Sequence, residues 1–257
     1  MRVDLAGQVA VVTGAGGGIG RAVSLLLARA GARVLGVDRD AERGRETAEL
    51  VRAEGSDARF AQADVARADD VKAYVSAALD AWGRLDVFMN NAGAQGPVSP
   101  ISECPDEDFD AVMAVNVRGV FLGLKHVLPV MVAQARGAVV NTASLGAFVG
   151  VRNLGPYVAS KHAVMGLTRT AALEVARRGV RVNAVCPGPV DTDLLRSIEA
   201  GQAGEDADAL RQRRAASVPQ GRTARPEEVA SVMMFLASDL AAHVVGQGVH
   251  VNGGSYA

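Results

Sequence analysis

The feature that most constrains this chain is a glycine-rich loop between an apolar run and an amphipathic stretch. Val9–Val12 is wholly apolar, Gly14–Gly20 contains five glycines, and apolar residues recur at helical spacing over Ile19–Ala30. A short apolar run that ends in glycines is typical of a strand buried on both faces of a parallel sheet. The glycines allow a tight turn and bring backbone N–H groups to a helix start, where a pyrophosphate can bind. The segment therefore predicts a strand, a phosphate-binding turn and a helix.

The rest of the chain repeats this alternation of apolar runs and helical patterns. Further strands are expected at 34–38, 58–63, 85–89, 138–142, 180–186 and 248–251, and further helices at 41–54, 69–82, 107–135, 157–178 and 226–237. This alternation favours a parallel sheet covered by helices on both faces, with right-handed connections. We expect an α/β fold: a Rossmann-like, doubly wound parallel sheet of about seven strands in a single domain, 1–257. The polar, arginine-rich stretch 191–223 predicts a helical flap over the site, with a disordered insertion as the alternative.

Charge and composition exclude several classes of partner. The 27 basic and 28 acidic residues give a net charge of −1, and aromatic residues make up only 4%. Neither value favours nucleic acid or an anionic membrane as a partner. The first residues lack the apolar core of a signal peptide, and no unbroken apolar run approaches ~18–20 residues. The histidines show no metal-ligand spacing. We expect a cytoplasmic protein with no metal and no membrane or nucleic-acid partner.

A second motif can carry acid–base chemistry. Tyr157 and Lys161 are four positions apart and so share one face of the expected helix. An ordinary tyrosine pKa of about 10 is too high for a base near neutral pH, but a neighbouring cation stabilises the phenolate. Ser144 follows the strand expected at 138–142, where its hydroxyl can hold a substrate oxygen. Taken singly, the serine is equally consistent with a helix cap, and the other two with surface positions.

Together, Gly14–Gly20, Ser144, Tyr157 and Lys161 resemble the signature of the short-chain dehydrogenase/reductase family, and the resemblance covers nearly all 257 residues. It implies hydride transfer between a nicotinamide cofactor and a carbinol carbon. It assigns proton transfer to Tyr157 and substrate-oxygen binding to Ser144, while Lys161 lowers the tyrosine pKa and contacts the cofactor ribose. It also implies that Asn116 kinks its helix and fixes a water that relays protons to Lys161.

The resemblance implies a set of cofactor contacts in the glycine-rich loop, after several strands and on the Tyr/Lys helix. These residues are Gly14, Gly17, Gly18, Ile19, Gly20, Asp38, Arg39, Asp64, Val65, Asn91, Ala92, Gly93, Tyr157, Lys161, Pro187, Gly188, Val190 and Thr192. Two alternatives stay open. Asp64 can be a helix N-cap, and 187–192 can be a plain Pro/Gly turn.

Asp38 bears on the choice between NAD and NADP. It ends the second expected strand, where a carboxylate can accept both adenosine-ribose hydroxyls of NAD and repel the 2′-phosphate of NADP. The loop Gly14–Gly20 contains no Lys or Arg. Arg39 is the contrary signal, since a basic residue there can pair with that phosphate. We predict NAD, with NADP as the less favoured alternative.

The candidate substrate residues are mostly apolar, with two amides that can orient a ligand: Gln95, Ser144, Asn153, Tyr157, Leu194 and Leu195. Such a lining favours a neutral secondary alcohol or ketone as the small-molecule substrate. Arg152 and Arg196 count against a wholly uncharged pocket, although surface positions are expected for both. The family resemblance narrows the substrate to cyclic or aryl-substituted secondary alcohols.

Three alternative functions remain: a 3-oxoacyl-[acyl-carrier-protein] reductase, a sugar (glucose-type) dehydrogenase, and a non-catalytic nucleotide-sensing protein. The carrier-protein reductases tend to have an arginine before the helix glutamate, where this chain has Leu173 before Glu174. Nucleotide sensors lose the Tyr/Lys pair, which is present here. Relatives in the family are mostly tetramers that pair the helices expected at 107–135 and 157–178, so the resemblance implies a homotetramer.

Overall fold

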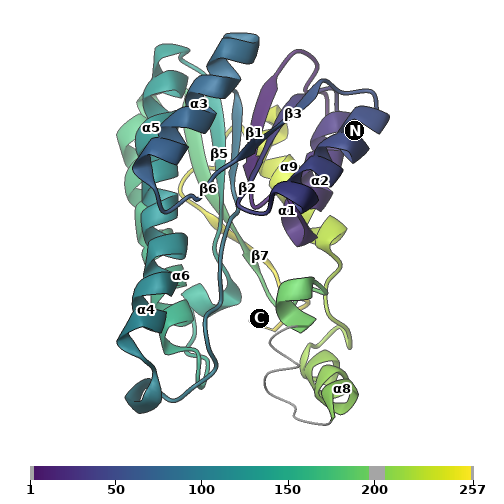
Figure 1. Ribbon diagram of the computed structural model, residues 1–257, viewed down its shortest axis with the longest axis vertical. Helices are drawn as coiled ribbons and strands as arrows, with labels where there is room; N and C mark the ends of the chain where they lie inside the picture. Colours follow the sequence, from purple (N-terminus) through teal and green to yellow (C-terminus); the bar gives the residue numbers. More distant parts are fainter. Residues whose placement is uncertain (1–2, 197–205, 256–257) are drawn as a thin grey trace.

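The computed structural model describes residues 3–196 and 206–255. Seven parallel strands form one sheet in the order β3-β2-β1-β4-β5-β6-β7 (Figure 1). They are β1 (Val9–Thr13), β2 (Arg33–Asp38), β3 (Ala58–Gln62), β4 (Val87–Asn90), β5 (Gly137–Thr142), β6 (Val180–Pro187) and β7 (Gly248–Val251). The predicted doubly wound sheet of seven strands is confirmed.

Helices cover both faces of the sheet (Figure 1). One face carries α1 (Gly18–Arg29), α2 (Ala41–Ala53) and α9 (Pro226–Ala237). The other face carries α3 (Ala68–Trp82), α5 (Gly119–Ala133) and α6 (Gly155–Val175), and α4 (Asp106–Met113) packs against α6. The apolar runs are explained by this arrangement, because successive side chains of a strand point to opposite faces. In β1, Val11 joins the cluster under α3 and α5, while Ala10 and Val12 join the cluster under α1 and α9.

The order of the strands locates a ligand site. The chain runs from β1 outwards to β2 and β3, and then returns to place β4 on the other side of β1. In open sheets of this kind, ligands bind beyond the carboxyl ends of the strands at the point where the order reverses. The loops after β1 and β4 therefore lie side by side at one edge of the sheet.

The helix expected at 107–135 is interrupted. It consists of α4, a π-helical turn at Ala114–Arg118, and α5. Among the described residues, the stretch Asp106–Ala133 is long and apolar enough by composition to cross a membrane. Counting unbroken apolar runs overlooked this stretch because charged residues divide it. A core helix of a globular domain has the same composition, and this one packs against α3 and α6.

The predicted flap at 191–223 is described only in part, because 197–205 lie outside the described residues. A single β-bridge between Val190 and Ala224 joins the two ends of this stretch. Between them, α8 (Ala207–Ser217) is helical, as the sequence predicts, and lies at the lower right in the view of Figure 1.

Candidate active site

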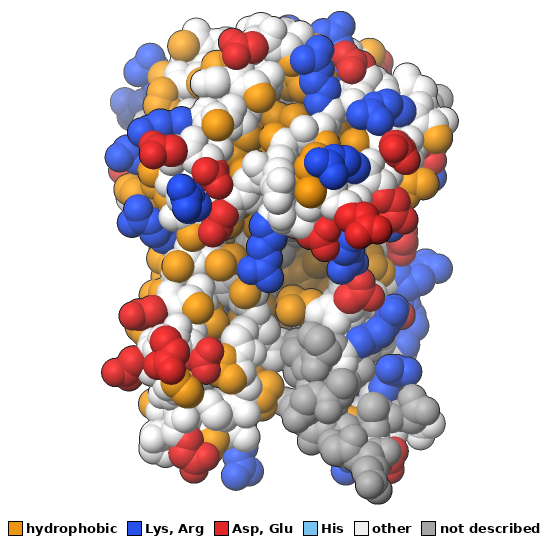
Figure 2. Space-filling view, viewed as in Figure 1, with side chains coloured by type: hydrophobic (Ala, Val, Ile, Leu, Met, Phe, Trp, Pro, Cys, Tyr) orange, Lys and Arg blue, Asp and Glu red, His pale blue; other side chains and the backbone are white. Residues whose placement is uncertain are grey.

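A cavity of about 770 Å³ opens beyond the carboxyl ends of the strands. In the space-filling view, the molecule is hollowed between the α4 end and the α8 end (Figure 2). The cavity is lined by the glycine-rich loop, the ends of β2 and β5, the loop after β4, the start of α6 and the segment after β6. Of the residues predicted for cofactor, catalysis or substrate, all line this cavity except Gly20, Asn116 and Asn153.

Gly20 and Asn153 shape the site from outside it. A Cβ on Gly20 would lie 1.9 Å from the carbonyl oxygen of Gly14, so glycine is required for α1 to pack against the loop. Asn153 has a left-handed backbone with φ of 64°. Its carbonyl accepts a 3.0 Å hydrogen bond from the amide of Ser99, which joins two walls of the cavity.

Asn116 lies in the π-helical turn and is fully buried. Its Oδ1 accepts a 2.8 Å hydrogen bond from the amide of Ala94. Its Nδ2 donates to the carbonyl of Ala94 and to the hydroxyl of Ser160. The side chain therefore fixes the loop after β4 to helix α6. The helix is interrupted at this residue, as expected, and a water relay through Asn116 stays a prediction.

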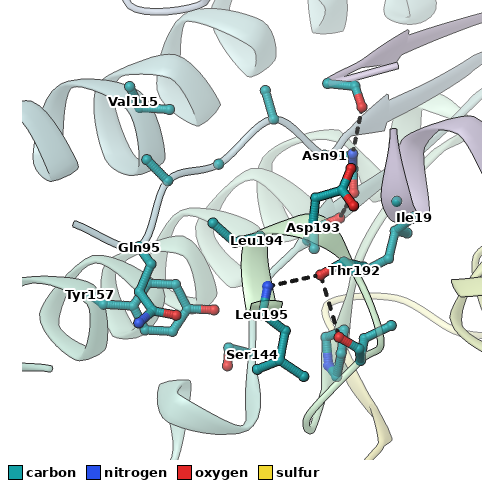
Figure 3. Close-up of a pocket in the computed structure, with 18 of the residues that line it drawn as sticks. Ile19, Asn91, Gln95, Val115, Ser144, Tyr157, Thr192, Asp193, Leu194 and Leu195 are labelled. Atoms are coloured by element: carbon teal, nitrogen blue, oxygen red, sulfur yellow. Dashed lines mark hydrogen bonds between the residues drawn. The ribbon is translucent and has the colours of Figure 1, made fainter. Parts of the chain in front are cut away.

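Ser144, just after β5, and Tyr157 of α6 both line the cavity (Figure 3), and Lys161 of α6 lines it too. The nearby Ser144 hydroxyl lowers the pKa of Tyr157, but burial has the larger effect and raises it. The Lys161 ammonium lies 5.6 Å from the centre of the tyrosine ring and donates a 2.8 Å hydrogen bond to the carbonyl of Thr142. Ser144 also caps the short turn that follows it, by accepting a hydrogen bond from the amide of Gly146. Its role in holding a substrate oxygen stays a prediction.

Burial also acts on the lysine. Lys161 is only 4% exposed. Desolvation lowers its pKa from 10.5 to about 8, and the neighbouring Cys186 thiol opposes that shift. The same burial that weakens the lysine as a cation also disfavours the phenolate of Tyr157. A further positive charge in the cavity would therefore lower the pKa of Tyr157 and favour release of its proton.

The glycine-rich loop is held against β2 and β4. Oδ2 of Asp38 accepts a 2.8 Å hydrogen bond from the amide of Gly16. Gly14 has a φ of +66°, and a Cβ there would lie 3.0 Å from the Cα of Ala92. The residues at the start of α1, Gly17 to Ile19, line the cavity, where the backbone amides of a helix N-terminus can bind a pyrophosphate. Asp38 therefore both orders the loop and lines the cavity.

The N-cap alternative for Asp64 is not what the structure shows. The N-cap of α3 is Arg67, and the Asp64 carboxylate instead accepts a 2.9 Å hydrogen bond from the amide of Ala66. Asp64 and Val65 both line the cavity. Thr192 contacts the opposite side of the loop, with its methyl 3.1 Å from where a Cβ of Gly18 would lie. Its hydroxyl accepts a hydrogen bond from the amide of Leu195 (Figure 3).

Sequence reasoning missed two arginines that line the cavity. Arg43 of α2 forms a 2.5 Å ion pair with Asp193, and its guanidinium lies over Gly17 of the glycine-rich loop. Arg214 of α8 also lines the cavity, as does Arg152, which is exposed. No local spacing reveals Arg43, because its partner is 150 residues away. Among the described residues, no group of three or more His, Cys, Asp or Glu side chains is placed to hold a metal ion.

The chain is similar to known oxidoreductases over almost its whole length. A family model described as enoyl-(acyl carrier protein) reductase matches residues 14–256. Cyclohexanol dehydrogenase of Acinetobacter sp. (strain SE19) is 39% identical over 246 residues, which is 96% of this chain and 94% of the relative. Levodione reductase of Leifsonia aquatica is 38% identical over 257 residues, covering 97% and 94% of the two chains.

Two solved structures share the fold. A crystal structure of levodione reductase matches with a TM-score of 0.95 and 37% identity, covering 97% of each chain. The structure of an NAD+-bound xylitol dehydrogenase matches with a TM-score of 0.92 and 34% identity, covering 96% of this chain and 98% of the other. With the family model and these full-length relatives, the resemblance read from the glycine-rich loop and the Tyr/Lys pair is confirmed: the chain belongs to the short-chain dehydrogenase/reductase family and is an oxidoreductase.

Proposed function

We propose that the protein transfers hydride between NAD(H) and a neutral secondary alcohol or ketone, of the cyclic or aryl-substituted kind. The observation that carries this proposal is that a cofactor-binding part and a catalytic part line one cavity. The phosphate-binding loop and Asp38 form the first part, and Ser144, Tyr157 and Lys161 form the second. A nucleotide-sensing role would leave the catalytic part without a purpose.

The residues present fit NAD. The cavity offers backbone amides at Gly17 to Ile19 for a pyrophosphate, a carboxylate at Asp38 for the ribose, and apolar Val65 beside Asp64. The NAD+-bound state of the related xylitol dehydrogenase supports the same cofactor for this chain. Arg39 is exposed and lines the cavity beside Asp38, so it stands where the alternative cofactor NADP would place its phosphate.

The side chains divide the chemistry between them. When bound, the nicotinamide ring accepts the hydride from the carbinol carbon or returns it. Tyr157 takes the hydroxyl proton of the alcohol during oxidation and gives it back to the ketone during reduction. Ser144 holds the same oxygen, and Lys161 stabilises the phenolate through its positive charge. Asn116 acts through position, by fixing the backbone of Ala94 at the cavity wall.

The wall of the cavity and the relatives support the substrate class. The side chains around Tyr157 include Leu154, Leu194 and Leu195, which offer apolar surface for a ring. The relatives include a cyclohexanol dehydrogenase and a levodione reductase. Leu173, at the position expected to contact an acyl carrier protein, is 83% exposed and uncharged, so it offers no cation to an acidic partner.

A panel of substrates tests the proposal. Purified protein is assayed for NADH formation with cyclohexanol, 1-phenylethanol and glucose, and for NADH consumption with cyclohexanone and acetoacetyl thioesters. We expect kcat/KM for the cyclic or aryl pair to exceed that for glucose and the thioester by at least about tenfold, because unmatched polar groups cost that much in discrimination. A tenfold advantage for glucose or a thioester would reassign the substrate while leaving the family intact.

The Asp38→Ala variant tests the cofactor assignment. The wild type is expected to favour NAD over NADP by at least about tenfold in kcat/KM, or 1.4 kcal/mol. Loss of the carboxylate removes the repulsion of the 2′-phosphate, so the variant should lose most of this preference. Part of any general loss of affinity will come from the freed amide of Gly16, so the readout is the NAD/NADP ratio. A wild type that prefers NADP would contradict the assignment and point to Arg39.

Three broader features also belong to the proposal. Residues 1–257 form one dinucleotide-binding and catalytic domain, since both apolar clusters pack against the same sheet. The chain works in the cytoplasm. It assembles as a homotetramer, supported by the exposed apolar side chains of Phe109, Phe121 and Leu173 along α4, α5 and α6.

A further inference from the structure

Gln95 carries a buried amide that has no partner. Its side chain is 9% exposed and lines the cavity. The Nε2 atom is fully enclosed and makes no hydrogen bond within the described part of the chain. Buried side-chain amides nearly always have partners, because losing those offered by water is costly. An unpartnered amide in a cavity wall therefore points to a ligand group that completes it.

The backbone before Gln95 is held by hydrogen bonds, and the backbone after it packs closely against α4. Ala94 is held at both its amide and its carbonyl by the side chain of Asn116. Gly96 has a φ of +74°, and a Cβ there would lie 2.4 Å from Cγ2 of Val112. These contacts set the position of the Gln95 backbone at the cavity wall, as expected for a residue that recognises a ligand.

Gln95 lines the same cavity as the residues assigned to the chemistry. In the close-up, Gln95 and Tyr157 are drawn on the same side of the cavity, which Ser144, Leu194 and Leu195 also line (Figure 3). Ser144 and Tyr157 are committed to the reacting oxygen under the proposed function. The leucines offer nothing to a second polar group. Among the arginines in the lining, Arg152 is exposed and Arg214 already has an interaction of its own. Gln95 is therefore placed to bind a different oxygen on the same substrate molecule.

We propose that Gln95 recognises a second oxygen on the substrate, so that the preferred substrates are cyclic secondary alcohols with another hydroxyl or keto group on the ring. This rests on the proposed function and narrows it to ring diols, hydroxyketones and diones. Rotation of the amide presents either its oxygen to a hydroxyl or its NH₂ to a ketone. Oxidation converts one CH–OH to C=O, with the hydride passing to NAD and the proton to Tyr157. The second oxygen is bound and unchanged.

The test compares one ring with and without the second oxygen. kcat/KM with NAD is measured for cyclohexanol and for the 1,2-, 1,3- and 1,4-cyclohexanediols, in the wild type and in Gln95→Met. We expect at least one diol to exceed cyclohexanol by about tenfold or more in the wild type, equal to 1.4 kcal/mol. Methionine keeps the length of the side chain and removes its hydrogen bonds, so the diol-to-cyclohexanol ratio should fall to near one.

Two further variants keep the test decisive. Gln212→Met makes the same change at an exposed position of α8 outside the cavity lining and should leave the ratio at its wild-type value. Gln95→Glu retains acceptors and loses the NH₂ donor, so it should keep a preference for diols and lose any preference for cyclohexane-1,4-dione over cyclohexanone in reduction with NADH. Gln95→Glu also provides an independent test if Gln95→Met does not fold.

The outcomes separate this inference from the proposed function. If cyclohexanol and all the diols are oxidised equally by the wild type, or if Gln95→Met leaves the ratio unchanged, Gln95 does not recognise a second oxygen, although the proposed function stands. If none of these alcohols reduces NAD while another substrate class does, the proposed function itself fails, and this inference fails with it.

Discussion

Replacement of Tyr157 by phenylalanine is expected to lower kcat by roughly 10²–10⁴-fold, the range associated with losing a positioned general acid–base. The change removes only the phenolic oxygen and keeps the ring. The ring lies beside the lysine ammonium, at 5.6 Å from its centre. Folding should survive, because the hydroxyl faces the cavity and Ser144 keeps its bond from the amide of Gly146. The measurement is steady-state NADH formation together with circular dichroism of the purified variant.

Tyr74 supplies the matched control. Tyr74 lies on α3 and is 1% exposed, and its ring stacks on Phe88 outside the cavity lining. Tyr74→Phe removes the same kind of atom. It should leave kcat within about threefold of the wild type, because a change in the core outside the active site alters stability and does not touch the reacting atoms. A Tyr157→Phe variant with activity close to that of Tyr74→Phe would remove Tyr157 from the mechanism.

Lys161→Met is expected to have the second-largest effect on turnover. Loss of the ammonium removes the positive charge that stabilises the phenolate, so kcat should fall by about 10²–10³-fold and the pH needed for alcohol oxidation should rise. NADH binding, followed by fluorescence titration, should weaken in the same variant, because the resemblance assigns the ammonium a contact with the ribose. Normal turnover with weakened binding would restrict Lys161 to a cofactor role.

The same variant has a stability signature with a definite sign. The Lys161 pKa in the folded protein is about 8, below its ordinary 10.5, because burial disfavours the charged form. Below pH 8 Lys161 is protonated in both the folded and the unfolded state, and the folded state carries the full desolvation cost of the buried charge. Between pH 8 and 10.5 only the unfolded lysine is protonated, so its contribution to the unfolding free energy rises with pH.

The stability of Lys161→Met relative to the wild type should therefore be higher at pH 7 than at pH 10.5, by up to about 3 kcal/mol. The hydrogen bond to Thr142 is lost at both pH values and does not contribute to this difference. The relative stability of the variant should fall as the pH approaches 10. Urea unfolding of the cofactor-free proteins at several pH values measures the difference. A constant difference across this range would mean that Lys161 is not desolvated in the folded state.

Much of the fold could be predicted from the sequence because its signals are local. Strands buried on both faces read as unbroken apolar runs, and all seven expected strands overlap those in the structure. The interruption at Ala114–Arg118 was tied to Asn116 only through the family resemblance. Apolar periodicity continues through that turn and does not reveal it. The helix at Ala207–Ser217 was expected only in outline, since its polar sequence carries a weak pattern.

In the candidate site, too, some features could be predicted from local sequence patterns and others depend on the folded structure. Tyr157 and Lys161 could be placed together because a spacing of four residues is fixed by local helix geometry. Ser144 was added through the family resemblance, and all three line the cavity. The second role of Asp38, in holding the amide of Gly16, depends on how the loop folds back over β2. The ion pair of Arg43 with Asp193 depends on two segments that meet only across the finished cavity. The missing partner of Gln95 likewise appears only when every neighbour is in place.

The most direct test of hydride transfer follows a label from substrate to cofactor. Cyclohexanol with deuterium on its carbinol carbon is incubated with NAD and the enzyme, and the NADH formed is examined by mass spectrometry. The proposed function predicts cyclohexanone together with NADH that carries one deuterium, at a rate lowered in the Tyr157→Phe variant and unchanged in Tyr74→Phe. Absence of NADH, or NADH without deuterium, would contradict direct hydride transfer from a cyclic secondary alcohol.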